Sequence, residues 1–144
     1  MENNLKFDSA ICTSRVQSER LLALGLKKET ADIVLLKEMV YDEENHCTRD
    51  GEGYLIRPIE YLEGEEHRGH IPAWSLGRLI EMMPFDVVPE GGFDNIFTLT
   101  KDTSGYSVEY DGFSYYYKKN IYDTLIEGIE HLIKEGYFNK EYLV

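Results

Sequence analysis

The segment spanning residues 122–135 limits the possible folds of this chain more than any other part of the sequence. Its apolar side chains recur at three- and four-residue intervals, which gathers them on one face of a helix: Tyr122, Leu125, Ile126, Ile129, Leu132 and Ile133. Asn120 before the segment and Gly136 after it are typical capping residues. The sequence therefore predicts a helix that must bury one face against another layer. Gly128 costs about 1 kcal/mol relative to alanine inside a helix, so we expect a close backbone approach there.

The layer that this helix needs is predicted directly before it. Apolar and polar residues alternate over 106–110 and again over 113–117, with the period of two that is typical of a strand with one buried face. Asp111-Gly112 between the two runs suits a two-residue type I′ turn. Residues 96–100 can add a third strand. These three segments predict an antiparallel meander.

Five tyrosines fall on the predicted hairpin: Tyr106, Tyr110, Tyr115, Tyr116 and Tyr117. We expect most of these rings to pack under the C-terminal helix. Strict alternation places Tyr116 on the side opposite Tyr115 and Tyr117, so Tyr116 is expected to point outward. An exposed tyrosine there would suit a binding surface.

A second helix is predicted over about residues 14–24. Ser14 and Gln17 have the spacing of a capping box, and Gly25 fits the left-handed position that ends many helices. The apolar side of this helix would comprise Val16, Leu21, Leu22 and Leu24.

A third helix is predicted to begin at Ser75 and to end before Pro84. Trp74 and Leu79 are placed to form a hydrophobic staple at its start. Trp74 is therefore expected in the core, and its alternative role is that of a binding residue.

Residues 33–41 carry apolar side chains that fit neither the helical nor the strand period. We interpret this run as a strand paired with residues 54–61, in which Pro58 indicates a sheet edge. Polar loops are predicted at 43–52 and 63–69, and Gly51-Glu52-Gly53 reads as a turn. The chain is thus predicted to form a single α+β domain over residues 1–144. It would hold an antiparallel meander of about 3–5 strands and two or three helices, with the C-terminal helix packed on the sheet.

The charge of the chain narrows the choice of partners. With 27 Asp and Glu against 15 Lys and Arg, the 144 residues have a formal net charge of -12, of which -7 lies within residues 42–66. Affinity for nucleic acids comes largely from basic residues, so we expect neither nucleic acid nor an anionic membrane as a partner. No apolar run approaches the ~20 residues that span a bilayer, and no secretory signal is recognised. We expect a cytoplasmic protein in which Cys12 and Cys47 are free thiols.

Three segments are familiar as a set: SRVQSERLLALGLKKETADIVLL, IPAWSLGRLIEMMP and YDTLIEGIEHLIKEGYF. Together they resemble a group of small uncharacterised acidic proteins of Bacteroides-type gut bacteria and of their phages and prophages. The resemblance covers the length of the chain, with divergent acidic loops between the matching segments. It implies a setting in a phage or mobile element and carries over no activity and no functional residue.

Two kinds of chemistry have candidate residues in the region from 46 to 70. His46, Cys47, His67 and His70 could supply zinc ligands, but no established zinc-binding spacing is present. An enzyme could use the same His and Cys residues, yet acids and bases are common in any chain this charged. We therefore predict no metal, no cofactor and no catalytic activity, and keep the enzyme as an alternative.

By elimination, the sequence favours a small accessory or protein–protein interaction protein of unknown oligomeric state. The candidate binding residues are Glu43, Glu44, Glu65, Glu66, Tyr116 and Trp74. A second alternative is an acidic inhibitor or immunity-type protein, in which the acidic stretch attracts a basic partner.

Overall fold

The computed structural model describes residues 9–62, 69–88, 92, 95–110 and 115–144. Its helices are α1 (Arg15–Ala23), α2 (Leu76–Met82) and α3 (Ile121–Glu135), with short 3-10 turns η1 (Lys28–Thr30), η2 (Ile59–Leu62) and η3 (Lys140–Tyr142). Its strands are β1 (Ile33–Asp42), β2 (Cys47–Pro58), β3 (Ile71–Ala73), β4 (Asp86–Val87), β5 (Asn95–Asp102), β6 (Gly105–Tyr110) and β7 (Tyr115–Lys118). They form two antiparallel sheets, in the orders β2-β1-β3 and β4-β5-β6-β7. The predicted α+β class is confirmed.

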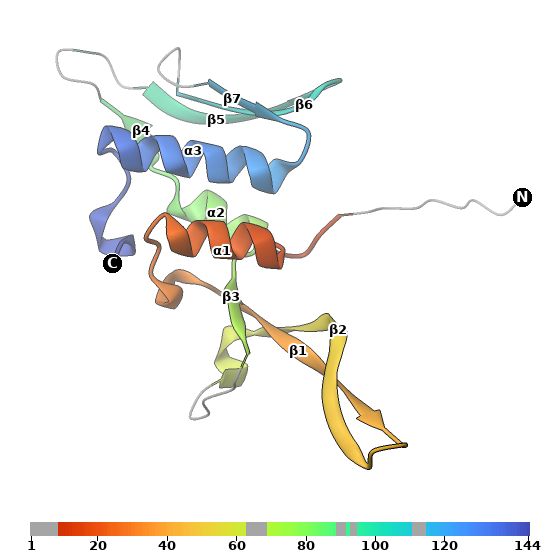
Figure 1. Cartoon of the computed structure of the whole chain (residues 1–144). Helices are drawn as coiled ribbons and strands as arrows, with labels where there is room; N and C mark the ends of the chain where they lie inside the picture. Colours follow the sequence, from red (N-terminus) through yellow and green to blue (C-terminus); the bar gives the residue numbers. More distant parts are fainter. Residues whose placement is uncertain (1–8, 63–68, 89–91, 93–94, 111–114) are drawn as a thin grey trace, which may run out of the picture.

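The elements are stacked in layers, with one hairpin projecting from the stack (Figure 1). The sheet of β5, β6 and β7 forms one outer layer, α3 lies against it, and α1 and α2 lie on the far side of α3. We call these layers the body. The β1–β2 hairpin, residues 33–58, leaves the body beyond α1 and is called the arm.

The main hydrophobic core surrounds α3, as its periodicity predicts. The buried side of α3 includes Leu125, Ile126, Ile129 and Leu132, all of them inaccessible to solvent. They share one cluster with residues of the meander, α1 and α2: Val108, Tyr110, Leu21, Trp74 and Leu79. Asn120 caps α3 by accepting from two backbone N–H groups, and Gly136 ends it with a φ of 80°. The predicted packing of α3 on the sheet is confirmed.

The close backbone approach expected at Gly128 is not found, because the nearest atoms are side-chain atoms of neighbouring elements. A Cβ atom at this position would lie 3.4 Å from the Met83 methyl carbon, 3.6 Å from Val108 and 3.8 Å from the ring of Tyr116. These are ordinary van der Waals distances, so α3 has room here for a methyl group and for little more.

The register of β6 and β7 corrects the prediction for Tyr116. A two-residue turn at Asp111-Gly112 requires Val108 to face Tyr115, whereas Val108 faces Tyr116 in the structure. The turn itself, and the side chains of Tyr115 and Tyr117, lie outside the described residues. A shift of one residue moves a side chain to the other face of a sheet. The prediction of an outward Tyr116 was therefore wrong: its ring is half-buried and packs against the α3 core, with its centroid 5.1 Å from that of His131.

Helix α1 begins and ends as predicted. The Ser14 hydroxyl accepts from the Gln17 N–H at 3.2 Å, and the Gln17 side chain accepts from the Ser14 N–H at 2.9 Å. Gly25 has a φ of 100°, and Leu26 donates to the Leu21 carbonyl at 3.2 Å in the Schellman pattern. The apolar side was partly wrong, because Val16 is 73% exposed.

The start of α2 forms the junction between the body and the arm. Trp74 is fully buried beside Leu79 in the main core, and its indole N–H donates to Thr30 at 3.0 Å. Its backbone carbonyl accepts from the Thr13 N–H at 2.9 Å. Ser75 caps α2 and donates its own N–H to the Asp32 carboxylate at 2.9 Å. These contacts join the entrances of α1, β1 and α2, and we call them the junction.

The predicted strand over residues 33–41 is confirmed as β1, and β2 lies at the sheet edge as Pro58 indicated. The loop predicted over 43–52 was wrong in length. Only residues 43–46 lie between the strands, and Gly51-Glu52-Gly53 is part of β2 rather than a turn. The loop predicted at 63–69 lies outside the described residues except for Gly69.

The first test of this architecture is the substitution Ile129→Ala. Ile129 has no exposed surface, so we expect a loss of about 2 to 5 kcal/mol in the free energy of unfolding, measured in urea. Val16→Ala is the matched control and should change it by less than about 0.5 kcal/mol. Equal effects of the two substitutions would contradict the packing described for α3.

The second test is Gly128→Ala. The new methyl group meets only ordinary contacts, and alanine favours the helix interior, so the free energy of unfolding should rise by about 0.5 to 1 kcal/mol. Gly128→Leu should instead lower it by about 1 to 3 kcal/mol, because the core at this point is filled. Thermal and urea unfolding of both variants measure the difference.

Candidate functional site

Among the described residues, the main hydrophobic core contains none from the arm, so core packing does not account for the arm. At its base, residues 33–35 of β1 pair with residues 71–73 of β3. Leu35 packs there with Cys12 and Ala73 in a small second cluster. Beyond Leu35, β1 pairs with no described strand other than β2, and the hairpin extends away from the body (Figure 1).

A bulge divides the arm into a basal and a distal half. Lys37 faces Tyr54 and Met39 faces Asp50, so three residues of β2, 51–53, stand opposite Glu38 alone. A Cβ atom on Gly51 would lie 2.9 Å from the Val40 side chain, which would have to shift, and 3.2 Å from the Glu38 carbonyl oxygen, which is a tight contact. Glycine is therefore favoured where the bulged strand crosses β1, and bulges of this kind bend a hairpin.

The tip of the arm is closed by local hydrogen bonds. Asp42 faces Cys47 across the last pair of the ladder, and its carboxylate accepts from the backbone N–H groups of Glu44 at 3.0 Å and Asn45 at 3.3 Å. The Asn45 side chain donates to it at 2.8 Å, and these bonds lower the pKa of Asp42. His46 completes the turn with a φ of 47°.

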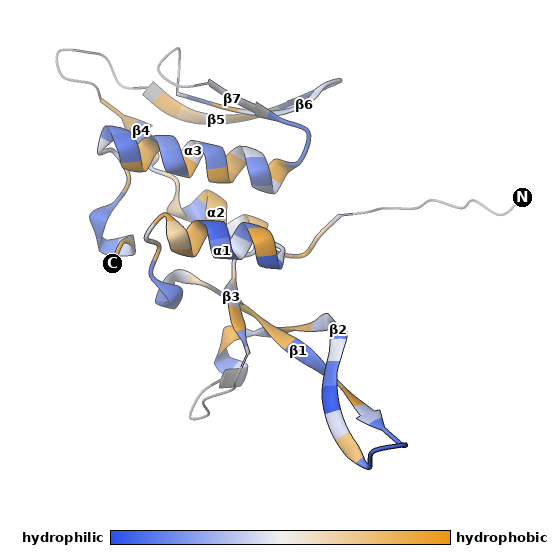
Figure 2. Cartoon of the chain, in the orientation of Figure 1, coloured by the Kyte–Doolittle hydropathy of each residue, from blue (hydrophilic) through white to orange (hydrophobic). Residues whose placement is uncertain are grey.

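The distal arm exposes apolar side chains on both of its faces. Met39, Val40 and Tyr41 are 56%, 39% and 57% exposed. Successive side chains of a strand point to opposite faces, so neither face of the distal arm is covered by the body. In Figure 2, β1 is hydrophobic at its base, hydrophilic in its middle and hydrophobic again toward the tip.

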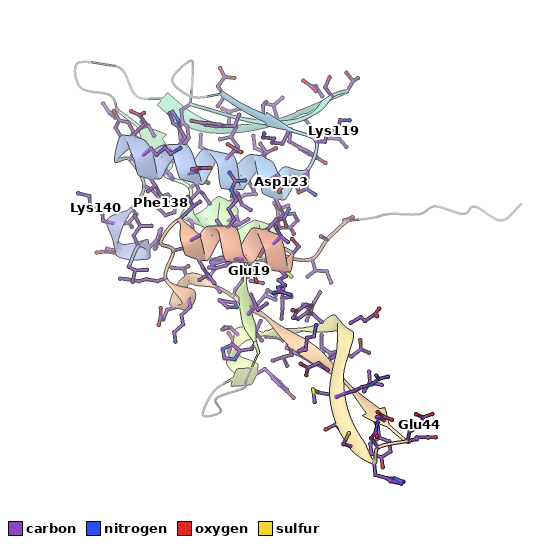
Figure 3. The ribbon with its side chains drawn as sticks, in the orientation of Figure 1. Glu19, Glu44, Lys119, Asp123, Phe138 and Lys140 are labelled. Atoms are coloured by element: carbon purple, nitrogen blue, oxygen red, sulfur yellow. The ribbon has the colours of Figure 1, made fainter. Side chains whose placement is uncertain are left out.

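These apolar residues lie within a strongly acidic segment. Residues 38–52 contain six carboxylates and one arginine, which gives a formal net charge of -5. Among the described residues, none of the ion pairs involves a carboxylate of this segment. Figure 3 places Glu44 at the far end of the arm, well away from Lys119 and Asp123 on the body. The distal arm therefore combines exposed apolar side chains with unpaired negative charge.

An open groove of about 1000 Å³ runs beside the basal and middle parts of β1. Its apolar lining comes from both strands of the arm and from the segments that lead to β3: Leu36, Met39, Tyr54, Leu55, Tyr61 and Ile71. Arg15 lies at the groove with its guanidinium 2.8 Å from Glu19, a hydrogen bond that raises the pKa of Arg15. The Lys37 ammonium lies 4.7 Å from the centroid of the Tyr54 ring.

Four of the predicted site residues lie on the arm itself. Glu43 and Glu44 are exposed in the turn at the tip, next to His46 and the exposed Cys47. Glu65, Glu66 and His67 lie outside the described residues.

Trp74 and Tyr116 belong to the core instead. Trp74 is inaccessible, which confirms its expected place in the core and contradicts its alternative role as a binding residue. Tyr116 packs on α3, so its prediction as an outward binding residue was wrong. Trp74 is buried because its ring enters the main core from the junction. Tyr116 is turned inward by the one-residue shift in register.

The predicted zinc ligands are dispersed along the arm. His70 lines the groove next to Ile71, which pairs with Leu35, whereas Cys47 pairs with Asp42 at the tip. At about 3.3 Å per residue, the seven residues from Leu35 to Asp42 span roughly 23 Å. No group of three or more His, Cys, Asp or Glu residues able to hold a metal occurs in the described part of the chain.

Sequence reasoning missed the surface formed by Met39, Val40 and Tyr41. The signal was present, because the apolar residues of 33–41 match neither period. A strand that is buried at one end and solvated on both faces at the other has no single period, and only the structure shows where the change occurs.

Comparison with known proteins found no matching family model, no similar curated protein and no similar solved structure. No helix in the described ranges is long and apolar enough to cross a membrane. The geometry of the arm is therefore the basis for proposing a function.

The two cysteines give a direct test of this geometry. Cys47 is exposed on the arm, whereas Cys12 is buried, and burial together with the Asp32 carboxylate raises the pKa of its thiol. At pH 8, a thiol reagent should modify Cys47 rapidly in the native protein and Cys12 only after denaturant is added. Mass spectrometry of the modified peptides identifies the site, and rapid modification of Cys12 would contradict the packing at the base of the arm.

Proposed function

We propose that this protein is a small accessory protein that binds another protein through its arm and has no catalytic role. The observation that carries this proposal is the exposure of Met39, Val40 and Tyr41 on both faces of a projecting hairpin. Leu55 and Ile56 extend the same exposed surface toward the base. Several exposed apolar side chains on one element, surrounded by polar residues, are typical of sites where proteins interact.

The distal arm contributes little to the folding of the protein. Its distal half makes none of the core contacts that hold α3 on the meander, and the cluster at its base consists of Cys12, Leu35 and Ala73. Exposed apolar side chains on an isolated hairpin add little to folding stability. Their removal from water by a partner would lower the free energy of the complex.

The enzyme alternative receives less support from the same geometry. A nucleophile and its base must lie within about 2.6 to 3.2 Å of each other, whereas Cys47 and His70 lie near opposite ends of β1. His46 in the tip turn is next to Cys47 at the start of β2, and both are exposed to solvent.

The setting in a phage or mobile element remains part of the proposal. It rests on the resemblance described above, and the arm is compatible with it, because a binding hairpin needs no cofactor and no dedicated chemistry. Neighbouring genes that encode phage structural proteins would support an accessory role.

The proposed function is tested by changing the arm and comparing it with a matched position on the body. In the double variant Met39→Ser/Tyr41→Ser, partner recovery from a lysate of the source organism should fall at least about tenfold, because interface anchors contribute about 1.4 kcal/mol or more each. Phe85→Ser is the control, since Phe85 is 77% exposed on the body. Thermal unfolding verifies that both variants remain folded.

A photo-crosslinking residue at position 41, and at position 85 for comparison, adds a readout that does not depend on affinity. We expect a discrete adduct from the arm and none from the body. If the two positions give the same adducts, or if the arm variant recovers the same partners as the parent protein, the arm is not the binding element.

A further inference from the structure

We infer that the partner binds by strand addition: an extended basic segment of another protein pairs with the outer edge of β1 and places apolar side chains in the groove beside it. The inference rests on the proposed function and names the mode of binding and the chemistry of the partner. The outer edge is the side of β1 that β3 occupies at residues 33–35.

The direction of the backbone groups of β1 follows from its pairing with β3. Val34 faces Pro72, and proline has no backbone N–H, so this pair cannot exchange two hydrogen bonds. The bonded pairs are therefore the flanking ones, in which Ile33 and Leu35 direct their N–H and C=O groups toward β3. These groups alternate along a strand, so Lys37, Met39 and Tyr41 direct theirs to the same side.

Beyond Leu35, this side of β1 is open in the described part of the structure. β3 begins at Ile71, opposite Leu35, and no described strand continues along Lys37, Met39 and Tyr41. An unpaired row of alternating donors and acceptors is a template for another strand. A segment added here would extend the line of β3 toward the tip of the arm.

The groove provides the specificity that backbone pairing lacks. It is lined by Leu36 and Met39 from β1, by Tyr54 and Leu55 from β2, and by Tyr61, His70 and Ile71. Because Ile71 pairs with Leu35 at the outer edge, we place the end of the groove nearest β3 beside that edge. Every second side chain of an added strand points to one face, so alternate residues of the partner would enter the groove. Because the lining is mainly apolar, we assign apolar side chains to those positions.

The negative charge of the distal arm indicates which residues should lie between the apolar side chains of the partner segment. Residues 38–52 carry a formal net charge of -5. The groove itself is lined by two acids, Glu38 and Asp50, neither of which forms an ion pair among the described residues, and by two basic residues, Arg15, which bonds Glu19, and Lys37, which lies over the Tyr54 ring. The excess negative charge therefore lies toward the tip, at Asp42, Glu43 and Glu44. A segment that alternates apolar and basic residues would be complementary to this surface. A second copy of the chain would bring two acidic arms together, and like charges in one interface disfavour such a dimer.

The opposite edge of the hairpin, on β2, is a poorer template. The three-residue bulge at 51–53 interrupts it midway, and bulges and prolines are the devices that protect sheet edges from pairing. Pro58 lies at its end. The outer edge of β1 has no such interruption between Lys37 and Tyr41.

The test uses a seven-residue synthetic peptide in which valine alternates with lysine, and a counterpart in which glutamate replaces lysine. We expect the lysine peptide to bind the full-length protein at least about tenfold more tightly than the glutamate peptide, and more weakly as salt is raised. Amide hydrogen exchange followed by NMR locates the contact. The amides of Lys37, Met39 and Tyr41 should gain protection, and those of Tyr54 and Ile56 on β2 should not.

Two N-methylated lysine peptides test the strand geometry itself. One is methylated at alternate amides, and the other at the remaining amides. Only one set faces β1 in a paired strand, so one methylated peptide should lose binding at least about tenfold and the other should retain it. Equal binding of the two would overturn strand addition.

The remaining outcomes are also decisive. Protection at Tyr54 and Ile56 would place the partner on β2, and concentration-dependent self-association through the arm would make the occupant a second copy. Either result overturns the inference. If neither peptide binds while Met39→Ser/Tyr41→Ser still loses its partner, strand addition fails and the proposed function stands. If that variant also retains its partner, both fail.

Discussion

The buried indole of Trp74 connects the arm to the body, and the arrangement of the whole molecule depends on that contact. The ring belongs to the main core, while its N–H bonds to Thr30 just before β1 and its backbone bonds to Thr13 just before α1. Asp32 accepts from Ser75 at the start of α2. Because these segments meet around one buried side chain, core packing fixes the direction in which the arm leaves the body.

The body and the arm are stabilised by different interactions. In the body, α3 is held by burial of a full apolar face and by Arg20, which bonds Glu127 and Glu130 at 3.0 and 2.6 Å. In the distal arm, ladder hydrogen bonds and a closed tip maintain the hairpin without a core. In the proposed mode of binding, its negative charge would disfavour pairing of the open, partly apolar edge with other copies, since charged side chains are a usual means of protecting such edges. The same charge would favour partners of opposite sign.

Much of the body was predictable because its signals are local. The caps at Ser14, Ser75 and Asn120 were each recognised from the residue and its immediate neighbours, and the periodicity of α3 gave both its limits and its buried face. The site was less predictable. The acidic tip with Glu43 and Glu44 was identified from charge, but the exposed apolar residues beside it were not, since exposure depends on where the body ends.

The sequence by itself determined the α+β class and the three helices, because capping and periodicity act over a few residues. For the arm it predicted the strand at 33–41, but it placed the partner strand at 54–61 instead of 47–58. Only the tertiary structure decided the register that turns Tyr116 inward, the bulge at Gly51 and the unpaired edge of β1. These features depend on contacts between segments distant along the chain. A one-residue shift in strand register leaves no local signal in the sequence, and neither does the start of β3 at Ile71, opposite Leu35. Yet both determine which side chains and backbone groups are accessible to a partner.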